Sequence, residues 1–287
     1  MTYTVGSVPY LNAKPLVRLF EELGDDSPVK VVYAVPSKLP AMLASGEVQA
    51  ILVSSIEALR TPGKRVAEGV CIGSKREVLS VRLFSKVAPG KIRTLALDQS
   101  SMTSNALAQI ILKEAYGVEP IAEPAPPCLS DMLATHDACV LIGDNGMREE
   151  GNGLNILDLG LEWYRLTRLP FVWAVWMGDE GLTPELSYLL YSAERWGALN
   201  LDRVIADAPS QTGLSPELCD RYLREIMQYP MHEKELLGFR EFARLLAEFN
   251  LVNRIQFPMI VPPSQTGVSG GLDLPFEVGP IHQTLLC

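Results

Sequence analysis

Residues 78–90, VLSVRLFSKVAPG, decide the expected fold of this chain. Their apolar run predicts a strand, and Pro89-Gly90 predicts a turn before a second strand begins. A similar stretch at 169–178, LPFVWAVWMG, leads into a helical region. We expect both stretches to cross between two domains, with the roughly 80 residues between them inserted into a discontinuous first domain.

The remaining sequence predicts an α/β fold. Apolar runs at 50–53, 92–97 and 138–142 end in small or polar residues and precede helical periodicity, which is typical of parallel sheets. Thr183-Pro184 and Ser215-Pro216 each predict a helix start, because a capping residue precedes a proline. Ligands of such folds bind in a cleft between the domains, at the carboxyl ends of strands. The expected boundaries are 1–86 and 172–257 for domain I, 87–171 for domain II, and 258–287 for an irregular tail rich in proline and glycine.

Composition narrows the class of protein further. The formal net charge of -9 argues against a nucleic-acid partner, which requires a basic surface. No apolar run reaches the ~20 residues of a membrane span, and the first residues lack the pattern of a secretory signal. The five scattered cysteines predict reduced thiols, because none forms a CxxC pair. We therefore expect a soluble, cytoplasmic monomer or homodimer that acts on a small molecule without a cofactor or metal.

The sequence lacks the GxSxG, HExxH and P-loop motifs. Its three histidines, His136, His232 and His282, have no metal-ligand spacing, and we interpret each as structural or exposed. Polar residues instead gather at predicted helix starts, most densely in DQSSMTSNAL at 98–107. Such residues cap helices, but one cap needs only one of them. The cluster therefore favours binding of a carboxylate or phosphate at a helix amino terminus.

Six stretches resemble, in order, the motifs of the chorismate dehydratase family. They are VGSVPYLNAKPL (5–16), LVSSIEAL (52–59), VLSVRLFSK (78–86), LDQSSMTSNAL (97–107), DACVLIGDNG (137–146) and LPFVWAVW (169–176). The family catalyses the first step of the futalosine route to menaquinone. The resemblance implies a two-domain type II periplasmic-binding-protein-like fold. It also implies a hydro-lyase that converts chorismate to 3-[(1-carboxyvinyl)oxy]benzoate and water. The sister dihydroxynaphthoate synthase has a similar fold, but its amino-terminal motif differs from VPYLNAKPL.

The resemblance also implies the site residues. The expected catalytic residues are Asn12, which matches the asparagine of the first motif, and Asp144, which lies in the third loop. The expected substrate-binding residues are Ser54, Ser80, Ser101, Thr103, Ser104, Asn105, Gly143, Asn145 and Arg168. Two positions depart from the family pattern. Met102 stands where SSRTS would place a basic residue, and Arg168 stands where TGLPF has glycine. We hypothesise that Arg168 restores the positive charge that Met102 removes.

The sequence leaves more than one candidate for the general base. Asp144 and Asp98 are candidates, although both positions also suit a loop-capping carboxylate. We prefer the substrate's own enolpyruvyl carboxylate as the base, held in place by Asn12. A solute-binding protein for small carboxylates would have the same fold, and so would the effector domain of a transcription regulator. Such a regulator would carry a helix-turn-helix before the first strand, which here begins near residue 4.

Overall fold

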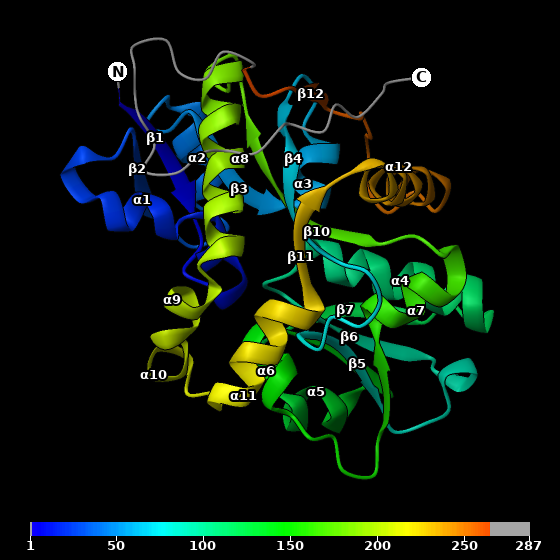
Figure 1. The fold of residues 1–287 in the computed structure, drawn as a ribbon. Coiled ribbons are helices and arrows are strands. Elements are labelled where there is room, and N and C mark those ends of the chain that lie inside the picture. Colours follow the sequence, from blue (N-terminus) through cyan, green and yellow to red (C-terminus); the bar gives the residue numbers. More distant parts are fainter. Residues whose placement is uncertain (1, 265–287) are drawn as a thin grey trace. The chain divides into compact units, whose positions relative to one another are not determined.

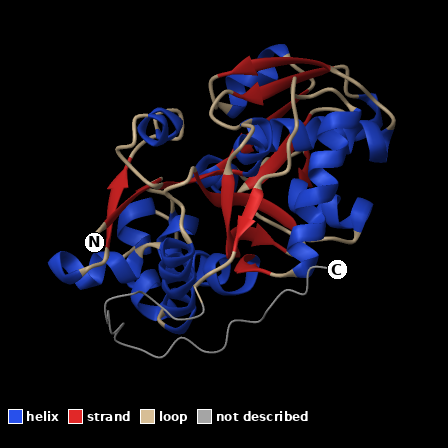
Figure 2. Cartoon of the chain, turned by 90° about the horizontal axis from the view of Figure 1, so that it is seen from above, coloured by secondary structure: helices blue, strands red, loops and turns tan. Residues whose placement is uncertain are grey.

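The computed structural model describes residues 2–264, and it contains two compact units (Figure 1). Unit 1 comprises Met1–Gly73, Val172–Leu236 and Arg254–Cys287, and unit 2 comprises Ser74–Phe171 and Leu237–Asn253. Both units are mixed α/β, with helices beside the strands of each sheet (Figure 2). The expected α/β class is therefore confirmed.

Unit 1 is built on a seven-stranded sheet in the order β11-β4-β10-β3-β1-β2, with β12 paired to β4. Strand β1 is parallel to both β2 and β3, whereas β10 is antiparallel to β3. The four residues 50–53 are all buried, as expected for a central strand. The strands are β1 (Tyr3–Ser7), β2 (Val29–Tyr33), β3 (Ala50–Ser54), β4 (Arg65–Ser74), β10 (Phe171–Gly178), β11 (Met227–Met231) and β12 (Met259–Val261).

Two helices of unit 1 start where capping residues predict them. The Thr183 hydroxyl accepts a hydrogen bond from Leu186 N at 3.3 Å, and the Ser215 hydroxyl accepts one from Leu218 N at 3.2 Å, which confirms both predicted caps. The helices are η1 (Leu11–Leu16), α1 (Arg18–Leu23), η2 (Gly24–Asp26), α2 (Leu39–Ala44), α3 (Ser55–Arg60), α8 (Pro184–Leu199), α9 (Leu201–Ala206), α10 (Ala208–Thr212), α11 (Pro216–Arg221) and η4 (Tyr222–Ile226). The first of these is a 3-10 helix and η4 is a π-helix.

Unit 2 is built on a five-stranded sheet in the order β7-β6-β8-β5-β9. Strand β6 is parallel to β7 and β8, and β5 is antiparallel to β8 and β9. Phe84, Cys139 and Leu141 from this sheet form one apolar cluster with Met132. The elements are β5 (Val81–Ser85), η3 (Pro89–Lys91), β6 (Thr94–Asp98), α4 (Met102–Tyr116), β7 (Ile121–Ala125), α5 (Leu129–Thr135), β8 (Ala138–Ile142), α6 (Gly143–Arg148), β9 (Asn155–Asp158), α7 (Leu159–Thr167) and, from Leu237 on, α12 (Glu233–Glu248).

The units differ from the expected domains in two respects. Unit 2 begins at Ser74 rather than at residue 87, because β5 pairs with β8 and β9 and so belongs to the second sheet. Unit 2 also gains residues 237–253. Phe242 of α12 packs edge-on against Trp163 and Phe171, with ring centroids 6.2 and 4.9 Å away, and this aromatic packing holds the helix in unit 2.

The expected irregular tail contains one ordered element. Strand β12 pairs in parallel with β4, from Met259 beside Arg65 to Val261 beside Ala67. Residues 265–287, which hold His282 and Cys287, lie outside the described part of the chain. The other four cysteines, Cys71, Cys128, Cys139 and Cys219, are free thiols. No helix within residues 2–264 is long and apolar enough to cross a membrane.

Candidate active site

In unit 1 the expected site residues follow two neighbouring parallel strands. Asn12 lies on η1, just after β1, and Ser54 is the last residue of β3. Because β1 and β3 are parallel neighbours, both residues follow strand ends at the same edge of the sheet. The Asn12 side-chain amide donates a hydrogen bond to the Tyr222 hydroxyl at 3.3 Å. Ser54 is half-buried, and its hydroxyl makes no capping bond to α3.

The stretch at 7–16 contains a short helix that begins before its proline. A proline favours the first turn of a helix, but η1 already begins at Leu11, with Pro15 inside it, and α1 begins at Arg18. Val17, with φ -126°, separates the two helices. The early start places Asn12 within the first turn of η1, and the side chain is half-buried there.

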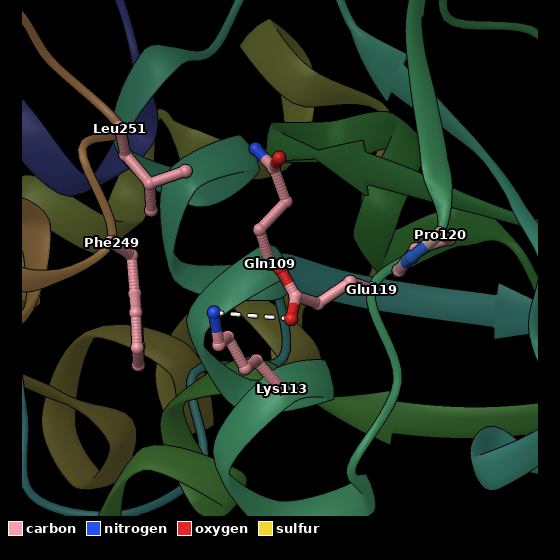
Figure 3. A pocket seen from close by; sticks show the side chains of 6 residues that line it. All are labelled: Gln109, Lys113, Glu119, Pro120, Phe249 and Leu251. Atoms are coloured by element: carbon pink, nitrogen blue, oxygen red, sulfur yellow. Dashed lines mark ion pairs between the residues drawn. The ribbon is translucent and has the colours of Figure 1, made fainter.

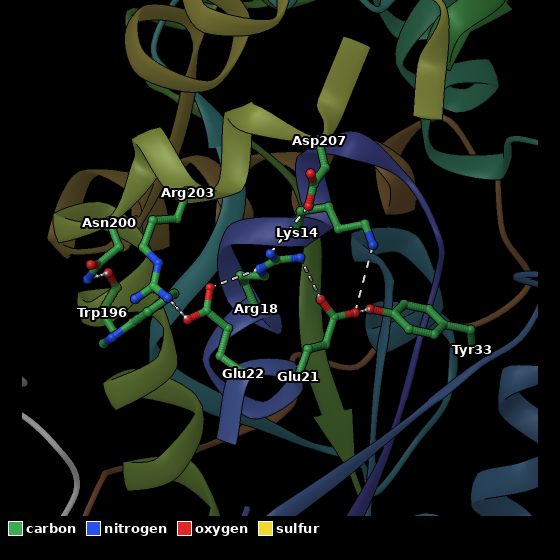
Figure 4. A network of polar contacts seen from close by, with 9 residues as sticks. All are labelled: Lys14, Arg18, Glu21, Glu22, Tyr33, Trp196, Asn200, Arg203 and Asp207. Carbon is green, nitrogen blue, oxygen red and sulfur yellow. Dashed lines mark hydrogen bonds and ion pairs between the residues drawn. The ribbon is translucent and has the colours of Figure 1, made fainter. Parts of the chain in front are cut away.

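Lys14, the lysine of this stretch, is paired with an acidic side chain of the protein itself (Figure 4). Lys14 Nζ lies 3.7 Å from Glu21 Oε1 and 5.4 Å from the centre of the Tyr33 ring. Arg18 bridges Glu21 and Glu22, and Tyr33 donates its hydroxyl hydrogen to Glu21. Burial and the neighbouring carboxylate raise the pKa of Tyr33. The network therefore neutralises Lys14 and fastens η1 to α1 and β2.

In unit 2 the sheet brings most of the expected residues to one edge. Strands β6 and β8 are parallel, so residues 98–105 and 143–145 both follow strands at their carboxyl ends. Ser80 precedes β5, and the next residue, Val81, pairs with Ile142 at the end of β8. A side chain at Gly146 would place its Cβ 2.6 Å from the Ser80 carbonyl oxygen, so α6 packs directly on this loop.

The start of α4 contains the predicted hydroxyl cluster. Ser101 is the helix cap, because its hydroxyl accepts a hydrogen bond from Ser104 N at 3.3 Å. Thr103 and Ser104 are buried. Asn105 donates to the Asp98 carbonyl at 2.8 Å, and its own side-chain oxygen is buried without a hydrogen-bond partner among the described residues. One residue caps the helix, and the others are additional polar groups at its amino end.

Asp98 and Asp144, the two candidate bases, differ in their surroundings. The Asp98 side chain is 1% exposed and accepts hydrogen bonds from both the backbone and the hydroxyl of Ser100. It therefore holds the turn before α4. Asp144 lies half-buried in the first turn of α6, directly after Gly143 with φ 59°. Asn145 is exposed.

Two charged residues that the sequence did not single out hold these loops. Arg82 donates to the carbonyl oxygens of Gly146 and Glu149, the latter at 2.6 Å, and so anchors the far end of α6. Burial lowers its pKa. The Asp158 carboxylate accepts from Leu79 N at 2.8 Å and also from Val78 N and Leu161 N. Burial raises the pKa of Asp158 against the opposing effect of these bonds. Two sequence signals could have identified these residues: an arginine within a strand, and an acid directly before a helix.

Arg168 is set apart from the other unit 2 residues. Helix α7 starts at the carboxyl end of β9, and Arg168 caps the opposite end, about 13 Å along a helix of nine residues. Its backbone has φ 63°, and its guanidinium lies 5.7 Å from the centre of the Tyr164 ring. The structure therefore does not bring Arg168 together with Ser101 or Asp144 within unit 2. Met102 is 41% exposed at the start of α4.

Two histidines have contacts that fit structural or surface roles. Nδ1 of His136 is 2.8 Å from the Thr135 hydroxyl, and Nε2 is 3.7 Å from Glu123. His232 is exposed, and its backbone N–H donates to Glu235. Within residues 2–264 no group of three histidine, cysteine, aspartate or glutamate side chains could hold a metal ion.

A surface pocket of unit 2 lies elsewhere (Figure 3). It is lined by Gln109, Lys113, Glu119, Pro120, Phe249 and Leu251, none of which was an expected site residue. Lys113 pairs with Glu119 at 3.1 Å and lies 4.6 Å from the centre of the Phe249 ring. The two charged side chains of this pocket therefore neutralise each other.

Solved structures define the fold class. The chain resembles the periplasmic aliphatic sulphonate binding protein of Escherichia coli with a TM-score of 0.61 and 15% identity, covering 99% of this chain and 98% of that one. It resembles a crystallised protein from Archaeoglobus fulgidus with a TM-score of 0.68 and 18% identity, covering 88% and 98%. The fold is therefore periplasmic-binding-protein-like, as expected.

Sequence comparison identifies the family. A family model described as menaquinone biosynthesis matches residues 3–248. A chorismate dehydratase from Thermus thermophilus is 31% identical over 264 residues, which cover 85% of this chain and 95% of that relative. The chain belongs to the menaquinone biosynthesis family.

Proposed function

We propose that this protein is a chorismate dehydratase, a hydro-lyase that forms 3-[(1-carboxyvinyl)oxy]benzoate and water. The observation that carries the proposal is the 31% identity to a chorismate dehydratase along 95% of that relative. The fold alone does not select this reaction, because the same architecture serves solute-binding proteins. Within menaquinone biosynthesis, we assign the protein to the first step of the futalosine route.

The reaction removes a proton and a hydroxyl group from the cyclohexadiene ring of chorismate. The electrons of the broken C–H bond become part of the ring, the C–O bond breaks, and the departing hydroxide takes up a proton to give water. The product ring is aromatic, which drives the reaction forward. The enzyme must therefore supply mainly orientation and help for the leaving hydroxyl, and orientation alone is worth up to ~7–11 kcal/mol.

The amino end of α4 supplies the groups for one carboxylate. Backbone N–H groups at a helix start carry a partial positive charge, and Thr103 and Ser104 add hydroxyls beside the Ser101 cap. Ser54, Ser80, Asn105, Gly143 and Asn145 are the further substrate-binding residues of the proposal. Asn12 holds the enolpyruvyl carboxylate through its side-chain amide.

We propose that this enolpyruvyl carboxylate accepts the ring proton. The bonds that Asp98 accepts from Ser100 support this assignment, because they occupy one of the two candidate protein bases. Asp144 is the other candidate, and no partner for its carboxylate in residues 2–264 would orient it as a base. Arg168 lies at the opposite end of α7 and is not part of this set of binding residues.

Incubation of the purified protein with chorismate, without metal or nucleotide, tests the reaction directly. Chromatography and mass analysis should detect the enolpyruvyl-benzoate product. Asn12→Ala should lower kcat/KM by about 100-fold, the cost of misplacing a reacting group. Asn152→Ala is the matched control, because Asn152 is an exposed loop residue that bonds only to Glu150 in the described chain.

The variant Asp144→Asn distinguishes between the substrate carboxylate and Asp144 as the general base. Substrate-assisted proton removal predicts a change of less than about threefold, whereas loss of a protein base costs about 100-fold or more. Binding of chorismate without turnover would favour a binding protein for small carboxylates or the sister enzyme. Absence of both binding and turnover would overturn the proposal.

A further inference from the structure

Unit 1 contains a buried acid that the proposed reaction does not use. Glu194 on α8 is 1% exposed, and neither of its carboxylate oxygens has a hydrogen-bond partner among the described residues. The hydroxyl of Tyr229 on β11 is also buried without a partner there. Unpaired buried polar groups destabilise a folded protein, and an unpaired charge does so most. The buried Glu194 carboxyl group and the buried Tyr229 hydroxyl, both in unit 1, therefore point to a function.

Helix α8 places Glu194 beside the helix that contains Asn12. Gly197 lies three residues after Glu194, so both are on one face of α8. A Cβ at Gly197 would lie 2.0 Å from the Pro15 carbonyl oxygen, which shows that this face touches η1. Pro15 and Asn12 are one turn apart on that 3-10 helix.

A second connection runs through the tyrosines. Tyr222 accepts the hydrogen bond of Asn12 and begins η4, whose π-helical turn leads directly into β11 and Tyr229. Burial raises the pKa of Tyr229 well above its usual value, and electrostatic interactions with Tyr222 and Glu194 raise it further. A Cβ at Gly69 on β4 would lie 2.9 Å from the Tyr191 ring of α8, so α8 packs on the strand that neighbours β11. π-Helical turns in proteins often occur at functional sites.

We propose that Glu194 is a positioning residue which, through Tyr229 and Tyr222, holds the side-chain amide of Asn12 in the orientation that binds substrate. This inference rests on the proposed function, since it assigns Asn12 a substrate to hold. Glu194 acts in its neutral form, which leaves no unpaired charge in the core. Ionisation places a negative charge there without a hydrogen-bond partner, so the tyrosines and Asn12 shift.

The surroundings of Glu194 bring its titration close to neutral pH. Burial raises its pKa to about 7, and the neighbouring Arg195 opposes the rise. Glu235, at the start of α12, acts with Glu194 to raise the pKa of the buried Cys71 thiol. The titratable and charged groups that interact with Glu194 are thus Tyr191 and Arg195 on α8, Cys71 on β4 and Tyr229 on β11. Tyr222 on η4 interacts with Tyr229, and Glu235 interacts with Cys71. All of these except Arg195 are neutral or acidic.

Nuclear magnetic resonance of the full chain, labelled with ¹⁵N in asparagine, tests the inference without substrate. The variant Asn12→Asp assigns the side-chain amide signal of Asn12. In the wild type this signal should shift with pH, with a midpoint near the titration of Glu194 at about 7. Glu194→Gln should abolish the shift, and Tyr229→Phe should reduce it. Glu185→Gln, in the first turn of the same helix, should leave it intact.

Turnover provides the second readout. Ionisation of one group at about pH 7 should lower kcat of the wild type by up to about tenfold from pH 6 to pH 8, and Glu194→Gln should flatten this profile. A shift of the Asn12 signal that persists in Glu194→Gln overturns the inference. If that variant does not fold, an unchanged shift in Tyr229→Phe overturns it instead. A shift that behaves as expected in a protein that does not convert chorismate refutes the proposed function and leaves the positioning role intact.

Discussion

Replacing Glu194 by glutamine changes how the stability of the protein depends on pH. The pKa of Glu194 is about 7 in the folded chain, against an ordinary value of 4.5, because the side chain is buried. Between these two values the folded protein binds one proton more than the unfolded chain, so the free energy of unfolding falls as pH rises. At about 1.36 kcal/mol for each pH unit, the full interval corresponds to about 3 kcal/mol.

This stabilising contribution is complete below pH 4.5 and is lost as pH rises through about 7. Glutamine has nearly the same shape and cannot ionise, so Glu194→Gln does not lose stability in this way. Between about pH 4.5 and pH 8, we therefore expect the free energy of unfolding of the wild type to fall by about 3 kcal/mol relative to that of the variant. Urea unfolding of both proteins at these two pH values measures the difference.

Glu185→Gln provides the matched control, because Glu185 lies in the first turn of the same helix and is only half-buried. It should show no comparable change with pH. A difference between wild type and Glu194→Gln that is the same at both pH values would refute the reasoning. It would mean that Glu194 remains ionised, or equally protonated, in the folded and unfolded chains.

The other predictions concern packing, capping and backbone strain. Gly197→Ala should destabilise the protein by about 1–3 kcal/mol, because the new Cβ meets the Pro15 carbonyl at 2.0 Å; an unchanged melting temperature would contradict the contact. Ser101→Ala should cost about 1 kcal/mol and Ser101→Gly only a few tenths, as measured by urea unfolding, because the alanine variant loses the cap of α4; equal stability of the two would exclude the cap. Arg168→Gly should stabilise the fold by up to about 1 kcal/mol, because φ at this position is 63°, whereas Arg168→Ala should not. If both Arg168 variants raise KM for chorismate equally, the guanidinium group takes part in binding.

Local signals in the sequence predicted most elements and several of their ends. Thr183 and Ser215 cap helices as expected, since capping depends only on residues within one turn. The residues expected around α4 and α6 share one edge of their sheet, since parallel strands bring their carboxyl ends together. The assignment of β5 to the first domain was wrong, because strand pairing with β8 joins residues about 55 positions apart.

The sequence by itself determined the α/β class, the family and the polar loops that follow its strands, because each of these depends on short motifs and local periodicity. Only the tertiary structure decided that most of α12 belongs to unit 2, that Arg168 lies at the far end of α7, and that Glu194 is buried without a hydrogen-bond partner in residues 2–264. Those facts depend on which side chains meet after distant segments pack. Asn12 shows both contributions, since its motif is local and its partner Tyr222 lies 210 residues away.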